Sequence, residues 1–149
     1  MTYYYKKKHS SLWRSAQIAQ GVMDNSCEED ELFIEKIGDT NPNNNQVHIF
    51  DARPHISAYA NRAKGGGLEK ESNYKNSKVI FGGVEGITSV QSAYKSLMKT
   101  CRSRSKLSHS NFLSKVESSG WYKLIRKQII FAVKAAHILH EEKENVLVH

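Results

Sequence analysis

Residues 120–149 constrain the fold most, because a long apolar helix is followed almost at once by a short β-branched strand. Apolar residues at helical spacing predict a helix over residues 120–140, with Ser119 as its N-cap. They spread around much of the helix, which favours burial between other elements. Residues 146–148 are predicted to be a buried strand. Strands that alternate with helices indicate an α/β architecture around a mainly parallel sheet.

The first half of the chain supplies the other predicted strands. Residues 2–8 and 11–17 are aromatic or alternating enough to predict two short strands, joined at residues 9–10. Residues 47–50 form a β-branched and aromatic run that predicts a third strand. Pro54 ends this run, because proline disfavours continued strand pairing.

One helix is predicted between these strands. Ser26 and Glu29 have capping-box spacing, and acidic residues crowd the first turn, where the helix dipole favours them. The helix is expected to turn Leu32, Phe33 and Ile37 toward the core.

Two further helices are predicted in the middle of the chain. Apolar residues recur at three- and four-residue spacing over residues 87–101, which predicts a helix with one apolar stripe. The members of this stripe are Ile87, Val90, Tyr94, Leu97 and Cys101. Ser110 is predicted to cap a shorter helix that carries Phe112, Leu113 and Val116.

Charge and cysteine content limit the classes of partner and compartment. The chain has 22 Lys and Arg against 15 Asp and Glu, a formal net charge of +7, which suits a phosphate-rich partner. The start of the chain lacks the apolar stretch of a secretory signal. The longest apolar run, residues 129–133, is far shorter than the ~20 residues that cross a bilayer. Cys27 and Cys101 fit neither a disulfide framework nor a metal motif, so we expect a reducing, cytosolic compartment.

Standard catalytic signatures are mostly absent from the sequence. It contains no Walker-type phosphate loop, nucleophile elbow or His-Glu-x-x-His pair. A solvated helix end explains His137 and His140 better than a metal site, since no third ligand is in view. Acidic neighbours oppose a lowered pKa at Cys27, and Cys101 lies on an apolar stripe, so we expect neither as a nucleophile.

Residues 61–67 combine two cations with three consecutive glycines. The glycines allow close backbone approach to a phosphate, and Arg62 and Lys64 add positive charge. An ordinary basic turn after a short helix explains the same pattern equally well. Spacing alone does not decide between the two.

Residues 50–67 strongly resemble the myotubularin family of phosphoinositide phosphatases. The resemblance rests on Phe-Asp-Ala-Arg-Pro at 50–54 and on Ala-Tyr-Ala-Asn-Arg-Ala-Lys-Gly-Gly-Gly at 58–67. Other segments are similar to the family in the expected order, at residues 3–6, 14–17, 116–121 and 146–149. The resemblance implies a cysteine-phosphatase (protein-tyrosine-phosphatase-like) α/β fold, present here as a partial myotubularin-type phosphatase domain over residues 1–149.

The activity that this resemblance implies is removal of the 3-phosphate from phosphatidylinositol 3-phosphate and phosphatidylinositol 3,5-bisphosphate. In the family, the nucleophilic cysteine of a Cys-x5-Arg loop comes directly after the position of His149, and its thiolate attacks phosphorus. This chain does not contain that cysteine, so we expect no catalytic residue, metal or cofactor in it and no activity from the chain alone. The alternative is a non-catalytic adaptor that binds and regulates an active family member.

The resemblance also implies substrate contacts and partners. Asn61 matches a family asparagine, and Ile87 matches a position that contacts the headgroup region through its backbone. Gly86 stands where the family usually has a second asparagine, so that amide is missing. The implied partners are a phosphoinositide headgroup, a peripheral membrane surface, and other myotubularins in homo- or hetero-oligomers.

The location implied by the family is the cytoplasm, with peripheral association to endosomal membranes. Nucleic acid is not expected, because the basic residues do not concentrate on one helix and no nucleic-acid motif occurs. The missing remainder of the domain predicts exposed apolar surface and an unpaired strand edge. We therefore expect an isolated chain that is prone to aggregation or partly molten.

Overall fold

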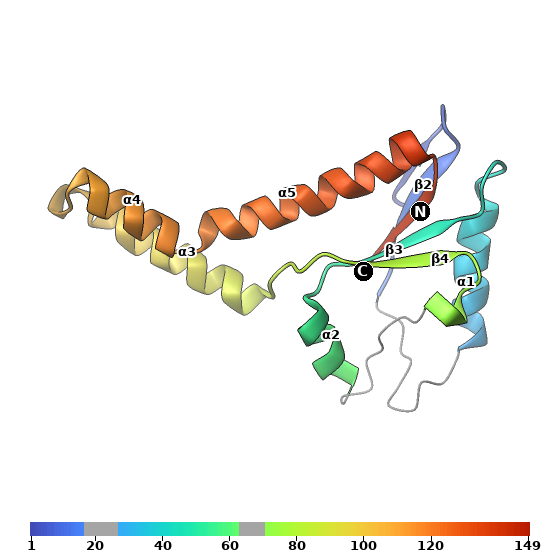
Figure 1. The fold of residues 1–149 in the computed structure, drawn as a ribbon, viewed down its shortest axis with the longest axis horizontal. Helices are drawn as coiled ribbons and strands as arrows, with labels where there is room; N and C mark the ends of the chain where they lie inside the picture. Colours follow the sequence, from blue (N-terminus) through green and yellow to red (C-terminus); the bar gives the residue numbers. More distant parts are fainter. Residues whose placement is uncertain (17–26, 63–70) are drawn as a thin grey trace. The chain divides into compact units, whose positions relative to one another are not determined.

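A mixed sheet organises the first of two units in the chain. The computed structural model describes residues 1–16, 27–62 and 71–149 (Figure 1). Residues 1–83 and 131–149 form the first unit, and residues 84–130 form the second. In the described residues the sheet has five strands, in the order β1-β2-β5-β3-β4. These are β1 (Tyr3–Tyr5), β2 (Ser10–Arg14), β3 (Val47–Asp51), β4 (Ser77–Phe81) and β5 (Asn145–Val148).

The strand directions confirm the predicted α/β architecture around a mainly parallel sheet. β1 pairs antiparallel with β2, whereas β2 with β5, β5 with β3, and β3 with β4 are parallel pairs. The helical elements of this unit are α1 (Glu28–Asp39), α2 (His55–Arg62), the short turn η1 (Glu71–Asn73), the end of α5 (Trp121–His137) and the π-helical turn η3 (Ile138–Glu142). β5 therefore lies in the middle of the sheet, as a buried strand.

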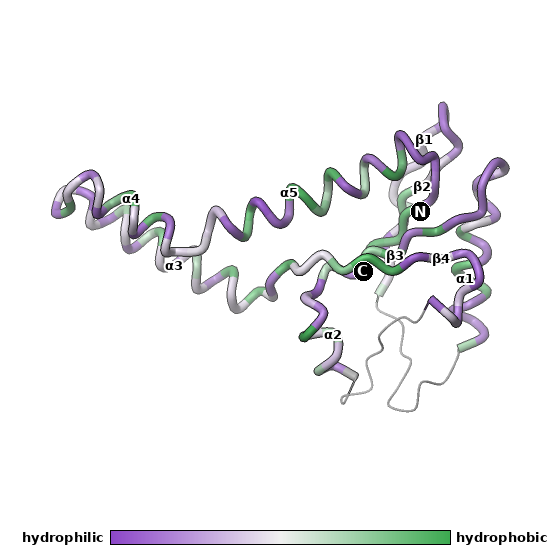
Figure 2. Tube along the Cα trace, viewed as in Figure 1, coloured by the Kyte–Doolittle hydropathy of each residue, from purple (hydrophilic) through white to green (hydrophobic). Residues whose placement is uncertain are grey.

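Both faces of the sheet are buried. One core cluster contains side chains of the sheet, of α1 and of the segment before β4, and its buried members are Ile34, Ile37, Val47, Ile49, Tyr74 and Leu147. The other packs the opposite face against the end of α5 and η3, and its buried members are Phe50, Ile138, Leu139 and Val146. Successive side chains of a strand point to opposite faces, so a strand buried on both faces is nearly continuously apolar. The hydrophobic colouring of the central strands in Figure 2 reflects this.

Asn145 ties β5 to β2 and to the end of α1. Its side chain is fully buried. The Oδ1 atom accepts hydrogen bonds from the backbone N of Ser11 at 2.9 Å and from the Ser11 hydroxyl at 2.8 Å. The Nδ2 atom donates to the carbonyl oxygen of Ile37 at 3.0 Å. One amide on β5 thus satisfies polar groups of two other elements inside the core.

The two N-terminal strands are shorter than predicted, and the predicted junction at residues 9–10 is wrong. β1 ends at Tyr5, and a turn leads to β2, which already begins at Ser10. The backbone N–H groups of Lys8 and His9 both donate to the carbonyl oxygen of Tyr5, at 3.0 and 2.9 Å. His9 has a φ of 60°, so the backbone reverses at this residue. The predicted end of the second strand at residue 17 lies outside the described residues.

The predicted inward face of α1 is partly wrong. Leu32 and Phe33 are exposed, whereas Ile37 is buried as predicted, together with Ile34. The close approach of the Asn-rich turn to Gly38 explains this orientation. A Cβ atom at Gly38 would lie 2.6 Å from the carbonyl oxygen of Asn45, so the side of α1 that carries Gly38 must face inward.

The start of α1 differs from the predicted cap at Ser26, which lies outside the described residues. The helix begins at Glu28, and Cys27 occupies the N-cap position without a side-chain cap. The predicted acidic first turn is confirmed.

The second unit contains α3 (Ile87–Arg102), the short turn η2 (Arg104–Lys106), α4 (His109–Ser118) and the first part of α5. α3 and α4 pack side by side (Figure 1). The predicted cap at Ser110 is wrong, because the Ser108 hydroxyl accepts the hydrogen bond from the backbone N of Asn111. The predicted α3 helix is confirmed, but its apolar stripe is not its buried side: Ile87 is 71% exposed, and the buried residues are Ala93 and Thr100.

The long helix is confirmed with a shorter extent than the predicted residues 120–140. α5 ends at His137, and the chain continues into η3. Ser119 does serve its start, since its hydroxyl accepts from the backbone N of Trp121 at 3.3 Å. The predicted burial between other elements is wrong, because Ile129 is 57% exposed and Leu124 is the buried residue within the helix. Polar and apolar residues alternate along α5 (Figure 2).

No helix in the described part of the chain combines the length and the apolar character that crossing a membrane requires.

Candidate active site at the carboxyl end of the sheet

The parallel strands bring four chain segments together where they end. Ligands of open α/β sheets bind outside the carboxyl ends of the strands, so these segments are the first place to look for a site. The backbone N of Ser15 donates to the carbonyl oxygen of Val148 at 3.2 Å, and Ala52 donates to His149 at 3.1 Å. Gly82, after β4, donates to Asp51 at 2.7 Å. The ends of β2, β5, β3 and β4 are therefore joined by main-chain hydrogen bonds.

A buried carboxylate fixes an arginine at this end of the sheet. Asp51 is fully buried, and its Oδ1 atom accepts from the backbone N and from Nε of Arg53, both at 2.9 Å. Its Oδ2 atom accepts from Arg53 Nη2 at 2.6 Å. The Arg53 side chain remains 20% exposed. The two-pronged contact orients the guanidinium, which is the geometry with which arginine binds carboxylates and phosphates.

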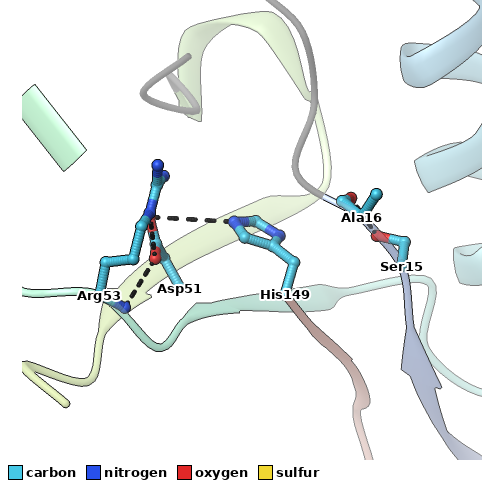
Figure 3. A network of polar contacts seen from close by, with 5 residues as sticks. All are labelled: Ser15, Ala16, Asp51, Arg53 and His149. Carbon is cyan, nitrogen blue, oxygen red and sulfur yellow. Dashed lines mark hydrogen bonds and ion pairs between the residues drawn. The ribbon is translucent and has the colours of Figure 1, made fainter. Parts of the chain in front are cut away.

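His149 lies beside this pair (Figure 3). Its side chain is 2% exposed, and Nε2 is 3.9 Å from Asp51 Oδ2. This separation is longer than a normal hydrogen bond, so Arg53 is the firmer partner of the carboxylate. Ser15 and Ala16 flank His149 on the side away from Asp51 (Figure 3). The histidine thus lies between the ends of β2 and β3.

Asp51 is ionised in the folded protein. Burial raises the pKa of its carboxyl group, but His149 and the hydrogen bonds from Arg53 outweigh burial and hold the pKa well below its ordinary range. Arg14, exposed at the end of β2, adds a positive charge at this end of the sheet. The fixed and partly exposed Arg53 guanidinium is suited to an anionic ligand.

The predicted contact Asn61 belongs to the same unit as this site. It lies on the last turn of α2, which follows Arg53 and Pro54, and it is half-buried. α2 is anchored by Ala58, which is fully buried and donates its backbone N–H to the carbonyl oxygen of Pro54 at 3.0 Å. The predicted glycine segment after α2 lies outside the described residues from residue 63 to residue 67.

The predicted contacts Gly86 and Ile87 belong to the second unit. Gly86 is the N-cap of α3, and its carbonyl oxygen accepts from Ser89 at 3.0 Å and from Val90 at 3.2 Å. Its position at a helix start agrees with ordinary loop chemistry. Ile87 is the first residue of α3. The three predicted contacts, Asn61 included, stay predictions.

Sequence reasoning missed the joint role of Asp51, Arg53 and His149. Asp51 and Arg53 entered only as the end of a strand and as part of a family motif. His149 entered only as part of a family-like segment and as the position before the family's cysteine. The sequence does carry a signal for Asp51 and Arg53. An acidic residue directly after an apolar strand can form a salt bridge with a basic residue two positions later. No local signal links His149 to Asp51, since parallel pairing of β3 and β5 brings them together.

Neither cysteine has the surroundings of a nucleophile. Cys27 Sγ donates to Glu29 at 3.3 Å. A backbone hydrogen bond from Asp30 lowers the pKa of the Cys27 thiol, but contact with the Glu29 and Asp30 carboxylates raises it more, so the net shift is upward. Cys101 is exposed on α3.

A second polar cluster lies at the opposite, amino end of the sheet. His48 Nε2 contacts the carboxylate of Glu144 and lies 3.9 Å from Glu142 Oε2. Among the described residues this trio is the group whose ligand atoms are close enough to hold a metal ion. The buried histidine already has a hydrogen-bond partner in the Glu144 carboxylate, which accounts for its position without a metal.

A mainly parallel α/β sheet with an oriented arginine at its carboxyl end defines a domain suited to binding an anionic ligand. The chain belongs to a more specific family within that class: it matches the family model of the myotubularin-like phosphatase domain over residues 1–149. This match confirms the predicted resemblance.

Curated relatives agree with this membership. The chain is 38% identical over 149 residues to the human phosphatidylinositol-3-phosphate phosphatase MTMR7, across 100% of the chain and 22% of that protein. It is 38% identical over 152 residues to the human phosphatidylinositol-3,5-bisphosphate 3-phosphatase MTMR8, across 100% of the chain and 21% of that protein. Identity to myotubularin of Xenopus tropicalis is 30% over 149 residues, across 100% of the chain and 24% of that protein. The chain thus spans about a fifth of the length of these relatives.

Proposed function

We propose that this chain is part of a phosphatase domain that removes the 3-phosphate from phosphatidylinositol 3-phosphate and phosphatidylinositol 3,5-bisphosphate. Membership of the family, and the activities that name its relatives, support this assignment. The domain would have the cysteine-phosphatase fold, with this chain as one portion of it. It would act in the cytoplasm on endosomal membranes, alone or in oligomers with other myotubularins.

The observation that carries the proposal is the Arg53, Asp51 and His149 group at the carboxyl end of the sheet. An ionised, buried Asp51 holds the Arg53 guanidinium in place before a ligand arrives. Such a preorganised group stabilises a phosphate without reorganisation during the reaction. Asn61, Gly86 and Ile87 would contact the inositol headgroup, with Gly86 contributing backbone only.

The nucleophile would come from outside this chain. The sequence contains no Cys-x5-Arg spacing, since residues 33 and 107, six positions after its cysteines, are Phe and Leu. In a cysteine phosphatase, a thiolate attacks phosphorus and the phosphoryl group passes to sulfur while the inositol oxygen leaves. Water then hydrolyses the thiophosphate to release phosphate. The chain alone should therefore position the headgroup and release no phosphate.

The second candidate is a non-catalytic adaptor that binds and regulates an active family member. It differs from the first candidate in lacking the Cys-x5-Arg nucleophile of the active family members. An adaptor would keep the fold, and its headgroup site would be free to degenerate.

A chimera tests the proposal. We replace the matching 149 residues of human MTMR7 with this chain, and measure phosphate release from phosphatidylinositol 3-phosphate and, as a specificity control, from phosphatidylinositol 4-phosphate. We expect the chimera to hydrolyse the first lipid and not the second, and the 149-residue chain to hydrolyse neither. In the chimera, Arg53→Gln should lower kcat/KM about 10- to 100-fold, the range for one charged hydrogen-bond partner.

A folded chimera without activity, judged by its thermal melt, would contradict the phosphatase assignment. If it also stimulated an intact relative, the adaptor would be favoured. Release of phosphate by the chain alone would contradict the inference that the nucleophile lies outside it.

A further inference from the structure

The second unit carries the entire net positive charge of the chain. Residues 84–130 contain nine Lys and Arg against two Glu, whereas the rest of the chain contains thirteen basic and thirteen acidic residues. The formal charge of +7 is therefore a property of the helical unit, and the unit that holds the sheet is balanced. Charge gathered on one part of a molecule attracts an oppositely charged partner to that part.

The cations of this unit concentrate at one end of α3. No acidic residue occurs between Glu85 and Glu117. Lys95, Lys99 and Arg102 are spaced by four and three residues, so they share one side of the helix. The basic surface consists of these three residues with Arg104 and Lys106 of η2, and all five are exposed.

These cations are not neutralised within the unit. No ion pair joins any of the five to an acidic side chain in the described part of the chain. Arg104 instead lies over the ring of Phe112, 4.8 Å from its centroid, and donates to the carbonyl oxygen of Leu107 at 3.3 Å. The positive charge is thus available to a partner.

Apolar side chains lie among the cations. A shallow groove on α3 is lined by Tyr94, Lys95, Met98, Lys99, Arg102 and Ser103. Tyr94 is 50% exposed. Tyrosine with long basic side chains suits the boundary between headgroups and acyl chains, where aromatic rings and Lys or Arg side chains are both favourable.

We propose that the basic surface docks on an anionic phospholipid bilayer. Charge complementarity identifies the partner, because a negative leaflet attracts clustered Lys and Arg. Tyr94 and Met98 among the cations favour a lipid surface over a nucleic acid, for which the chain has no motif. The inference rests on the proposed action at a membrane and names the surface that would contact it, but it does not require catalysis, since negative lipid without phosphoinositide suffices.

Vesicle flotation tests this docking with the 149-residue chain. The vesicles are phosphatidylcholine with or without phosphatidylserine, and the variant is Lys95→Gln/Lys99→Gln/Arg102→Gln. We expect binding only to the phosphatidylserine vesicles, and about a hundredfold weaker partitioning of the variant, on the order of fivefold for each cation. The matched control is Lys6→Gln/Lys7→Gln/Lys8→Gln, which removes the same charge from the other unit and should change partitioning by less than about fivefold.

Several results would overturn the proposal. One is equal loss in the two triple variants, which would mean that only total charge matters. Another is equal binding to neutral vesicles. A third is absent vesicle binding with tight binding to a DNA duplex, which would identify a nucleic-acid partner. If far-UV circular dichroism shows that the α3 variant has lost helix, the single changes Lys95→Gln and Arg102→Gln replace it, each with an expected loss of about fivefold.

Discussion

At the scale of single residues, Asp51 decides the electrostatics of the candidate site. It is fully buried, yet it stays ionised because Arg53 and His149 lie beside its carboxylate. A buried carboxylate that loses its partners, or a partner that loses the carboxylate, leaves an uncompensated charge in the interior. The strand end and the arginine therefore depend on each other.

Asp51→Asn should make stability less dependent on acid pH. The folded-state pKa of Asp51 lies below its ordinary value of 3.8, so the unfolded chain binds more protons than the folded one in the interval between them. The stabilisation from Asp51 is thus fully present above about pH 4 and is lost as the pH falls through the folded-state pKa. We expect the variant to lose about 2 kcal/mol of unfolding free energy at neutral pH, and the difference to shrink toward pH ~3.

Chemical denaturation across this pH range measures the effect. The control is Asp39→Asn, which removes an exposed carboxylate paired with Lys36 and should change the free energy by less than about 1 kcal/mol. A constant difference between wild type and Asp51→Asn at every pH would show that Asp51 does not titrate as described.

At the scale of elements, β5 is held by polar as well as apolar contacts. Leu147 packs on one face and Val146 on the other, while Asn145 bonds β2 and the end of α1. The strand's position between β2 and β3 places His149 in the candidate site. The contacts at the start of β5 therefore help to fix the position of His149 at its end.

Asn145→Leu should destabilise the protein by about 2–4 kcal/mol, because the buried backbone N–H of Ser11 would lose its acceptor and the hydrogen bond to the Ile37 carbonyl would be lost. Urea unfolding followed by circular dichroism measures the loss. Asn43→Ala, at an exposed position of the Asn-rich turn, is the control and should stay within about 0.5 kcal/mol. An unchanged midpoint for Asn145→Leu would show that water or other groups satisfy these partners.

The order of helices and strands could be predicted from the sequence, because apolar residues recur at a different spacing in each kind of element. α3 and β5 are confirmed near their predicted bounds, since Ile87 to Cys101 repeat at helical spacing and residues 146–148 are β-branched or aliphatic. The burial of each helix face could not be predicted. In α1, the contact between Gly38 and Asn45 sets the inward side, and that contact joins residues with no local signal.

At the scale of the whole molecule, the candidate active site and the net positive charge belong to different units. The unit with the sheet has balanced charge and the candidate active site, and the helical unit has the net positive charge. The family motif drew attention to the segment that contains Asp51 and Arg53. It did not predict that Asp51 lies near His149, because parallel pairing in the assembled sheet brings them together. Exposed Ile129, Ile130 and Val133 agree with the expected apolar surface, and the tendency to aggregate stays a prediction.

The central claim is that the carboxyl end of the sheet receives the phosphorylated headgroup. Titration of the ¹⁵N-labelled chain with a soluble, short-chain phosphatidylinositol 3-phosphate, followed by amide chemical shifts, tests it most directly. We expect the largest changes at Ala52, Arg53 and Gly83, and their loss in Arg53→Gln. Changes confined to the amino end of the sheet, around Asn44 and Glu144, would contradict the claim.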